Sequence, residues 1–123
     1  MSQLIKDFVA ELKETVPNAT IRPALGKYYK FPAIVYSVRN GMRTLFYVDS
    51  FGLKQTEVTI TLFSKSYDDV QLLKKQIMNK FHGFTGDLRE TNVSMIEIAN
   101  IFDGFDDALE EVHRTTFVFN IIN

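Results

Sequence analysis

The sequence predicts a single α+β domain, in which a mostly antiparallel sheet carries two amphipathic helices on one face as a two-layer sandwich. Two segments, 3–15 and 67–82, have apolar residues at helical spacing. Other segments are rich in β-branched and aromatic residues and are joined by short turns, which favours antiparallel pairing. The 123 residues suit one domain over 1–123 and leave too little chain for two cores.

The first helix is predicted over residues 3–15. Pro17 ends it, because a residue before proline disfavours helical backbone. The side chains expected on its buried face are apolar and recur at helical spacing: Leu4, Ile5, Phe8, Val9 and Leu12. The opposite face is expected to hold the charged residues Lys6, Asp7, Lys13 and Glu14.

A β-hairpin is predicted next. Residues 33–39 form a β-branched and aromatic run after Pro32, and Asn40-Gly41 follows. This dipeptide favours a tight type I′ turn, because both positions tolerate positive φ. Residues 43–48 are then expected to return as the second strand of the hairpin.

A strand and a second helix are predicted to follow the hairpin. Residues 55–63 alternate, with Val58, Ile60 and Leu62 on one face and Glu57, Thr59 and Thr61 on the other. Ser66 with Asp69 three residues later indicates a helix start. Along helix 67–82 the apolar side is formed by Val70, Leu73, Ile77 and Phe81, and Gly83 ends it.

Two further strands are predicted at 93–101 and 112–122, with a turn or short helix at 103–111. The last strand carries Phe117, Phe119 and Ile121 on one face. Its other face also bears apolar residues, namely Val112, Val118 and Ile122, so both faces are expected to be covered.

The composition argues against several classes of function. The formal net charge of −1 gives no strong field toward nucleic acid or an acidic membrane, and no apolar run approaches the roughly 20 residues that span a bilayer. Without cysteine there is no thiolate nucleophile and no Cys-ligated zinc. His82 and His113 have no Ser or carboxylate at a spacing typical of a triad. We therefore expect neither catalysis nor a cofactor.

Charge is unevenly distributed along the chain. The segment 103–111 has no base and holds Asp103, Asp106, Asp107, Glu110 and Glu111. Its spacing is not that of an EF-hand, so a solvated turn or an interface patch is a better interpretation than a metal site. The segment 15–48 has no acid and holds Arg22, Lys27, Lys30, Arg39 and Arg43. Its Lys27–Phe31 run alternates bases with aromatics, as single-strand nucleic-acid sites do, although inward-packed rings are the simpler interpretation.

A basic and an acidic segment in one chain suit a head-to-tail contact between copies. Such a heterologous contact, repeated around an axis, closes into a ring. This hypothesis follows from charge placement alone, and it predicts that charge reversal at Arg39 and Arg43 weakens assembly.

The layout resembles the tail terminator proteins of long-tailed bacteriophages, which are also called tail completion or minor tail proteins. The resemblance spans nearly the whole chain and begins with the N-terminal helix. It continues with the Phe31–Tyr36 strand entry, the alternating Glu57–Phe63 strand and the Ser66–Val70 helix start, and it ends with the acidic Asp103–Asp107 segment and the His113–Ile121 strand.

The resemblance implies a structural virion protein rather than an enzyme. Such proteins form a ring, usually of six copies, that caps the head-proximal end of the tail tube, stops its polymerisation and presents a surface to the head connector. Assembly takes place in the host cytoplasm, and DNA later passes through the ring without sequence-specific binding. The partners implied are further copies, the tail tube protein and connector proteins, with no membrane.

Candidate interface residues follow from these two arguments. They are Arg39, Asn40, Gly41 and Arg43 at the predicted hairpin tip, the aromatic residues Tyr28 and Tyr29, and the acidic residues Asp103, Asp106 and Asp107. A head–tail adaptor or neck ring protein is an alternative in the same virion setting. A small nucleic-acid-binding module is a third interpretation, which the absent Gly pattern in 113–121 and the near-zero charge disfavour.

Overall fold

The computed structural model describes residues 3–23, 32–44, 54–106 and 112–122, and for residues 39–44, 54, 105 and 106 it describes the backbone alone. Within these ranges the elements are, in chain order, α1 (Gln3–Thr15), β1 (Thr20–Pro23), β2 (Ala33–Thr44), β3 (Lys54–Ser64), α2 (Tyr67–Phe81), β4 (Gly86–Leu88), β5 (Thr91–Val93), β6 (Met95–Asp106) and β7 (Val112–Ile122).

Five strands form one sheet in the order β1-β2-β3-β7-β6, and β4 pairs with β5 in a separate hairpin. Within the five-stranded sheet, β1 and β2 are parallel and the other neighbouring strands are antiparallel. The central pair, β3 and β7, keeps one register from Gln55↔Ile122 to Ser64↔His113. The predicted mostly antiparallel sheet is thus confirmed.

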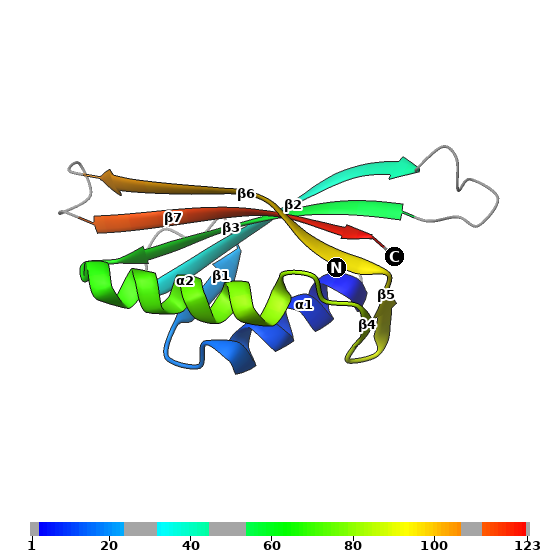
Figure 1. Ribbon diagram of the computed structural model, residues 1–123, viewed down its shortest axis with the longest axis horizontal. Coiled ribbons are helices and arrows are strands. Elements are labelled where there is room, and N and C mark those ends of the chain that lie inside the picture. Colours follow the sequence, from blue (N-terminus) through cyan, green and yellow to red (C-terminus); the bar gives the residue numbers. More distant parts are fainter. Residues whose placement is uncertain (1–2, 24–31, 45–53, 107–111, 123) are drawn as a thin grey trace.

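Both helices lie on the same face of the sheet, as the sequence predicted (Figure 1). The N-cap residue of α2 is Ser66, whose hydroxyl accepts a hydrogen bond from the Asp69 N–H. Beyond the end of α2, Gly83 has φ +75°, a left-handed conformation that glycine adopts without a Cβ clash.

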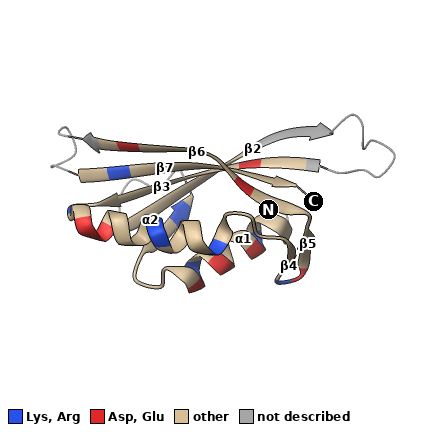
Figure 2. Cartoon of the chain, in the orientation of Figure 1, with Lys and Arg blue, Asp and Glu red and all other residues tan. Residues whose placement is uncertain are grey.

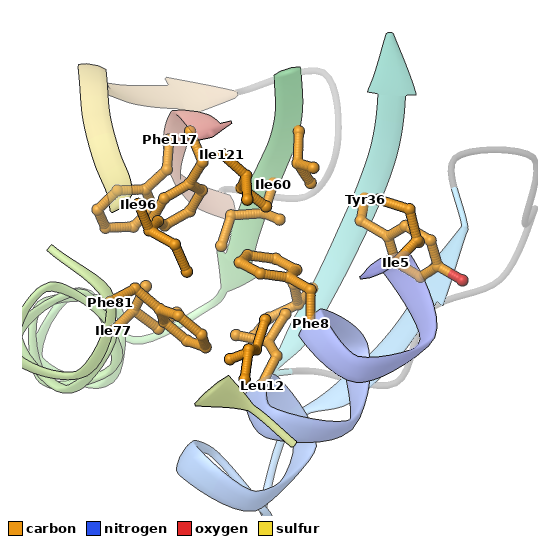
Figure 3. Packing of buried hydrophobic residues seen from close by; sticks show 14 of the residues in the cluster. Ile5, Phe8, Leu12, Tyr36, Ile60, Ile77, Phe81, Ile96, Phe117 and Ile121 are labelled. Carbon is orange, nitrogen blue, oxygen red and sulfur yellow. The ribbon is translucent and has the colours of Figure 1, made fainter. Parts of the chain in front are cut away.

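The core lies between the two helices and the sheet and is centred on phenylalanine rings (Figure 3). Phe8 of α1 packs against Phe81 of α2 and Phe119 of β7, with ring centroids 4.9 and 5.5 Å apart. Phe117 stacks beside Phe119 at 5.6 Å. The alternation in β3 puts Ile60 and its inward neighbours under these rings. The inward faces predicted for both helices and both strands are therefore the buried ones.

The predicted hairpin at Asn40-Gly41 is wrong. β2 continues through this dipeptide to Thr44 and pairs with β3, so the connection between the two strands is 45–53, outside the described residues. The register shifts here, because four steps along β2, from Arg39 to Arg43, oppose two steps along β3. Pairing with β3 sets the apolar residues of 33–38 beside those of 58–63, and the extra residues form a bulge, which also suits Asn-Gly.

The predicted turn or short helix at 103–111 is also wrong in its first part. β6 extends to Asp106, which pairs with Val112, and 107–111 lies outside the described residues. Acidic residues and glycine have low β-propensity, so the composition indicated a turn. The ladder with β7 nevertheless continues through Asp103↔Thr115 and Gly104↔Arg114. Three short strands, β1, β4 and β5, were not predicted, because none is long enough to show alternation.

Asp7 is buried, although its position in the helical pattern predicted an exposed side chain. Its carboxylate accepts hydrogen bonds from the Thr91 hydroxyl at 2.6 Å and the Gln3 side-chain amide at 2.8 Å. The Thr91 hydrogen bond holds the pKa of Asp7 below its usual value, against an opposing effect of burial. Asp7 therefore fastens the β4–β5 turn to α1.

Candidate interface surfaces

The predicted basic contact residues lie on β2 rather than on a hairpin tip. Arg39 pairs with Glu57 and Arg43 pairs with Gln55 of β3, while Asn40 and Gly41 lie in the register shift between them. Their side chains are not among those described. The other predicted contacts in this half of the chain, Tyr28 and Tyr29, lie outside the described residues.

The predicted acidic residues are spread along the end of β6. Asp103 is on the helix face, where its carboxylate accepts a hydrogen bond from Thr115 at 2.7 Å and forms an ion pair with Lys74 of α2 at 3.0 Å. These two partners, the Thr115 hydroxyl first, hold the pKa of Asp103 below its usual value. Asp106 ends β6 with its side chain not described, and Asp107 lies outside the described residues. The structure thus gives Asp103 a role in fastening α2 to the sheet.

The two charged segments lie toward opposite edges of the sheet. β2, with Arg39 and Arg43, has only the short β1 beyond it, whereas β6, which ends at Asp106, forms the other edge. Beyond the pair Pro23↔Tyr36, the β1 side of β2 has no partner strand among the described residues. The topology therefore separates the basic and acidic segments across the sheet.

A charged cluster that the sequence did not predict joins α1 to the β4–β5 turn. Arg89 has φ 57° and contacts Glu11 and Glu14, and Lys80 of α2 also reaches Glu11 at 3.4 Å. The basic side chains and Glu14 are solvent-exposed, whereas Glu11 is only 17% exposed, so the pair with Glu14 contributes little to stability. Their residues are far apart in sequence, and no local pattern could have identified the cluster.

No arrangement typical of catalysis is found among the described residues. They contain no group of three potential His, Asp or Glu metal ligands. A groove of about 320 Å³ between the α1–β1 turn and α2 is lined mainly by apolar and amide side chains, with Asp69 the single carboxylate. His82 caps the C-terminus of α2 through its backbone, and His113 packs edge-on against Tyr67. No described helix is long and apolar enough to cross a membrane.

The sheet face opposite the helices is not covered by any described element (Figure 1). We call it the open face, and its side chains on the three strands β3, β7 and β6 are Glu57, Thr59, Thr61, Phe63, Arg114, Thr116, Val118, Asn120, Ile122, Met95, Glu97, Asn100 and Phe102. Phe102 is 53% exposed and Met95 38%. Of the three apolar residues expected to be covered on the other face of the last strand, Val112 is buried, whereas Val118 and Ile122 are only half-buried.

A virion protein has this fold. The structure resembles a chain from the virion of a native gene transfer agent particle, with a TM-score of 0.61 over 97% of this chain and 90% of that chain. The two sequences are 9% identical, so the likeness concerns the fold. No family model matches the sequence, and no curated protein matches it.

Arg114 is the charged residue of β7 that lies on the open face. Its side chain lies across the neighbouring strand at Gly104, where an added Cβ would come within 3.0 Å of Nη2 and 3.2 Å of Nε. Gly104 therefore leaves the space that this side chain occupies. The sequence analysis did not single out Arg114, and only the Gly104↔Arg114 register reveals the arrangement.

Proposed function

We propose that this protein is a structural component of a phage-type virion, and that it acts as a tail terminator. In this role a ring of six copies caps the head-proximal end of the tail tube, stops tube polymerisation and offers a surface for head joining. DNA passes through the ring without sequence-specific contacts. The work is done by surface complementarity and symmetry, with no bond made or broken.

The observation that carries the proposal is the whole-chain likeness to a chain of the gene transfer agent virion. It covers 97% of this chain and 90% of the other, so the likeness extends over nearly the whole of both compared chains. The tail-terminator role within the virion rests on the resemblance in layout described above. A fold alone does not specify a function, so the role has to be tested at the surfaces.

The separation of charge across the sheet supports a head-to-tail ring. Arg39 and Arg43 belong to β2, near one edge, and Asp103 and Asp106 belong to β6, which forms the other edge. A contact between unlike edges is heterologous, and its repetition around an axis leaves no edge unused. A two-fold contact between like edges would instead oppose charges of the same sign.

The decisive experiment is incubation with purified tail tubes of the cognate virus and fresh tube protein. A terminator binds one tube end, seen by electron microscopy, and stops elongation at that end. Binding to the portal side of capsids, with tube growth unchanged, would refute the terminator role and favour a head–tail adaptor. Binding to single-stranded nucleic acid alone would contradict both, and the acidic residues Glu57 and Glu97 on the open face speak against that outcome.

A variant pair tests the ring contact separately. Arg39→Glu with Arg43→Glu should reduce the six-chain species seen by light scattering and weaken tube capping, because both reversals act at every contact of the ring. The matched control is Lys13→Glu with Lys75→Glu, two exposed lysines on the helices. Equal loss of assembly in both double variants would show a general charge effect and would contradict the edge contact.

A further inference from the structure

We propose that the open face is a second interface, on which two copies of this protein pack face to face about a two-fold axis. It is separate from the proposed ring contact, because it uses the face of the sheet and leaves both edges free. The occupant is a second copy of the chain, and the argument for it is the charge pattern along β7 and its two neighbours.

The open face carries exposed apolar surface. Phe102 is 53% exposed and Met95 38%. Ile122 of β7 pairs with Met95, and Val118 lies in the next pair on this face after Phe102↔Thr116. A sheet face that remains in water normally presents polar side chains, because alternation sends the apolar residues to the core. Exposed apolar side chains at two places on one sheet face, with polar side chains between them, suit a contact site.

The two ends of this face differ in charge. Arg114 lies toward one end of β7, and six residues along the strand Asn120 is flanked in register by Glu57 of β3 and Glu97 of β6. Figure 2 shows the basic segment of β7 toward one end of the sheet, with one acidic segment of β6 beside it, and a further acidic segment on each of β3 and β6 farther along the sheet. The acidic residue of β6 beside the basic segment is Asp103, whose carboxylate forms an ion pair with Lys74 of α2 on the helix face.

A two-fold axis through the middle of β7 makes this pattern self-complementary. The axis passes at the level of Phe117, midway between Arg114 and Asn120. Rotation about it sets each Arg114 over Asn120 of the other copy, between the two carboxylates Glu57 and Glu97. Among the described residues neither Arg114 nor Glu97 forms an ion pair within its own chain.

The apolar and hydroxyl side chains then meet near the axis. Thr116 and Val118 lie on either side of it and face the same pair in the other copy, because an isologous contact repeats itself. The axis runs across the strands, so β6 lies over β6 of the other copy and Phe102 lies over Asn100. Because Gly104 has no side chain, the Arg114 side chain can lie across β6 in the free protein. Arg114 is thus ordered before the two copies meet, which lowers the entropy lost on association.

The contact area indicates a weak dimer. Three strands spaced ~4.8 Å apart, over ten residues at ~3.3 Å each, give an overlap of about 450 Å² per copy. Twice this area is below the range of about 1,200–2,000 Å² typical of stable complexes. The dimer is therefore expected to depend on concentration and, because its specificity is ionic, on salt.

Charge reversal and charge exchange test the arrangement. Sedimentation equilibrium on the whole chain at low salt should show a monomer–dimer equilibrium. Arg114→Glu and Glu97→Lys should each raise the dissociation constant about tenfold or more, because symmetry applies each change twice. The triple variant Arg114→Glu with Glu57→Lys and Glu97→Lys should return to within about threefold of wild type, since it exchanges all three charges of the contact rather than removing them.

Two results would overturn this proposal. One is a monomer at every concentration, and the other is a dimer that both single variants leave unchanged. Lys75→Glu, on the exposed side of α2, is the control for a general charge effect, and circular dichroism confirms folding. Neither result bears on tube capping, which is measured separately.

A cysteine variant tests the position of the axis directly. The chain has no cysteine, so Thr116→Cys introduces a single reactive thiol near the proposed axis. A short bismaleimide should link two copies of this variant, and the same reagent should not link Lys75→Cys copies at equal concentration. Cross-linking of both variants to the same extent would contradict a face-to-face contact.

Discussion

Replacement of Phe8 by alanine tests the account of the core most sharply. The Phe8 ring is fully buried and contacts Phe81 and Phe119, so it joins α1, α2 and the sheet at one point. Phe→Ala substitutions in well-packed cores cost about 3–5 kcal/mol, through lost transfer free energy and the cavity left behind. Because three elements meet at this ring and cannot all move inward, we expect about 4 kcal/mol.

Urea unfolding followed by circular dichroism measures this loss, and thermal unfolding should show a midpoint about 12–20 °C lower. Phe102→Ala is the matched control, because it removes the same ring from the open face, where Phe102 is 53% exposed. At low protein concentration this control should change stability by less than about 0.5 kcal/mol. Equal losses at Phe8 and Phe102 would refute the assignment of the helix face as the core.

Two further predictions concern local contacts. Asp7→Asn should destabilise the fold at neutral pH, because the ionised Asp7 accepts hydrogen bonds from Thr91 and Gln3. The pKa of Asp7 is depressed in the folded state, so the difference from wild type in urea unfolding should disappear as pH falls through that pKa, and a constant difference at all pH values would count against it. Ser66→Ala should cost about 0.5–1 kcal/mol by removing the acceptor for the Asp69 N–H, while Ser66→Asp should retain stability in the same assay.

The helices were predictable because their information is local. Segment 3–15 matches α1 at both ends, and the predicted 67–82 differs from α2 by one residue. In α2 the helical spacing of the apolar residues identifies the buried side, and Ser66 and Gly83 mark where the helix begins and ends. None of these signals depends on a contact with another segment.

The pairing of strands was less predictable, because it depends on which segments meet in space. Asn40-Gly41 has the local chemistry of a hairpin turn, but β2 gains a longer partner and a buried face by pairing with β3. The acidic 103–106 segment likewise belongs to β6, because β7 offers partners for it and Thr115 and Lys74 accommodate Asp103. In both places tertiary pairing outweighs local propensity.

The candidate interface residues divide in the same way. The sequence identified the charged segments containing Arg39 and Asp106, and the strand order adds that they belong to opposite sides of the sheet. The sequence did not identify the charge pattern of Arg114, Glu57 and Glu97. These residues come together only through the pairing registers of β3 and β6 with β7.

By itself the sequence determined the α+β class, the two helices, the inward faces of β3 and β7, and the lack of cysteine. These properties depend on residue type and on periodicity within one segment. Only the tertiary structure decided the strand order, the bulge in β2, the burial of Asp7 and the open face with its charged ends. Those features arise where segments far apart in sequence meet, and the free energy that selects among pairings is summed over the whole core rather than stored in any local pattern.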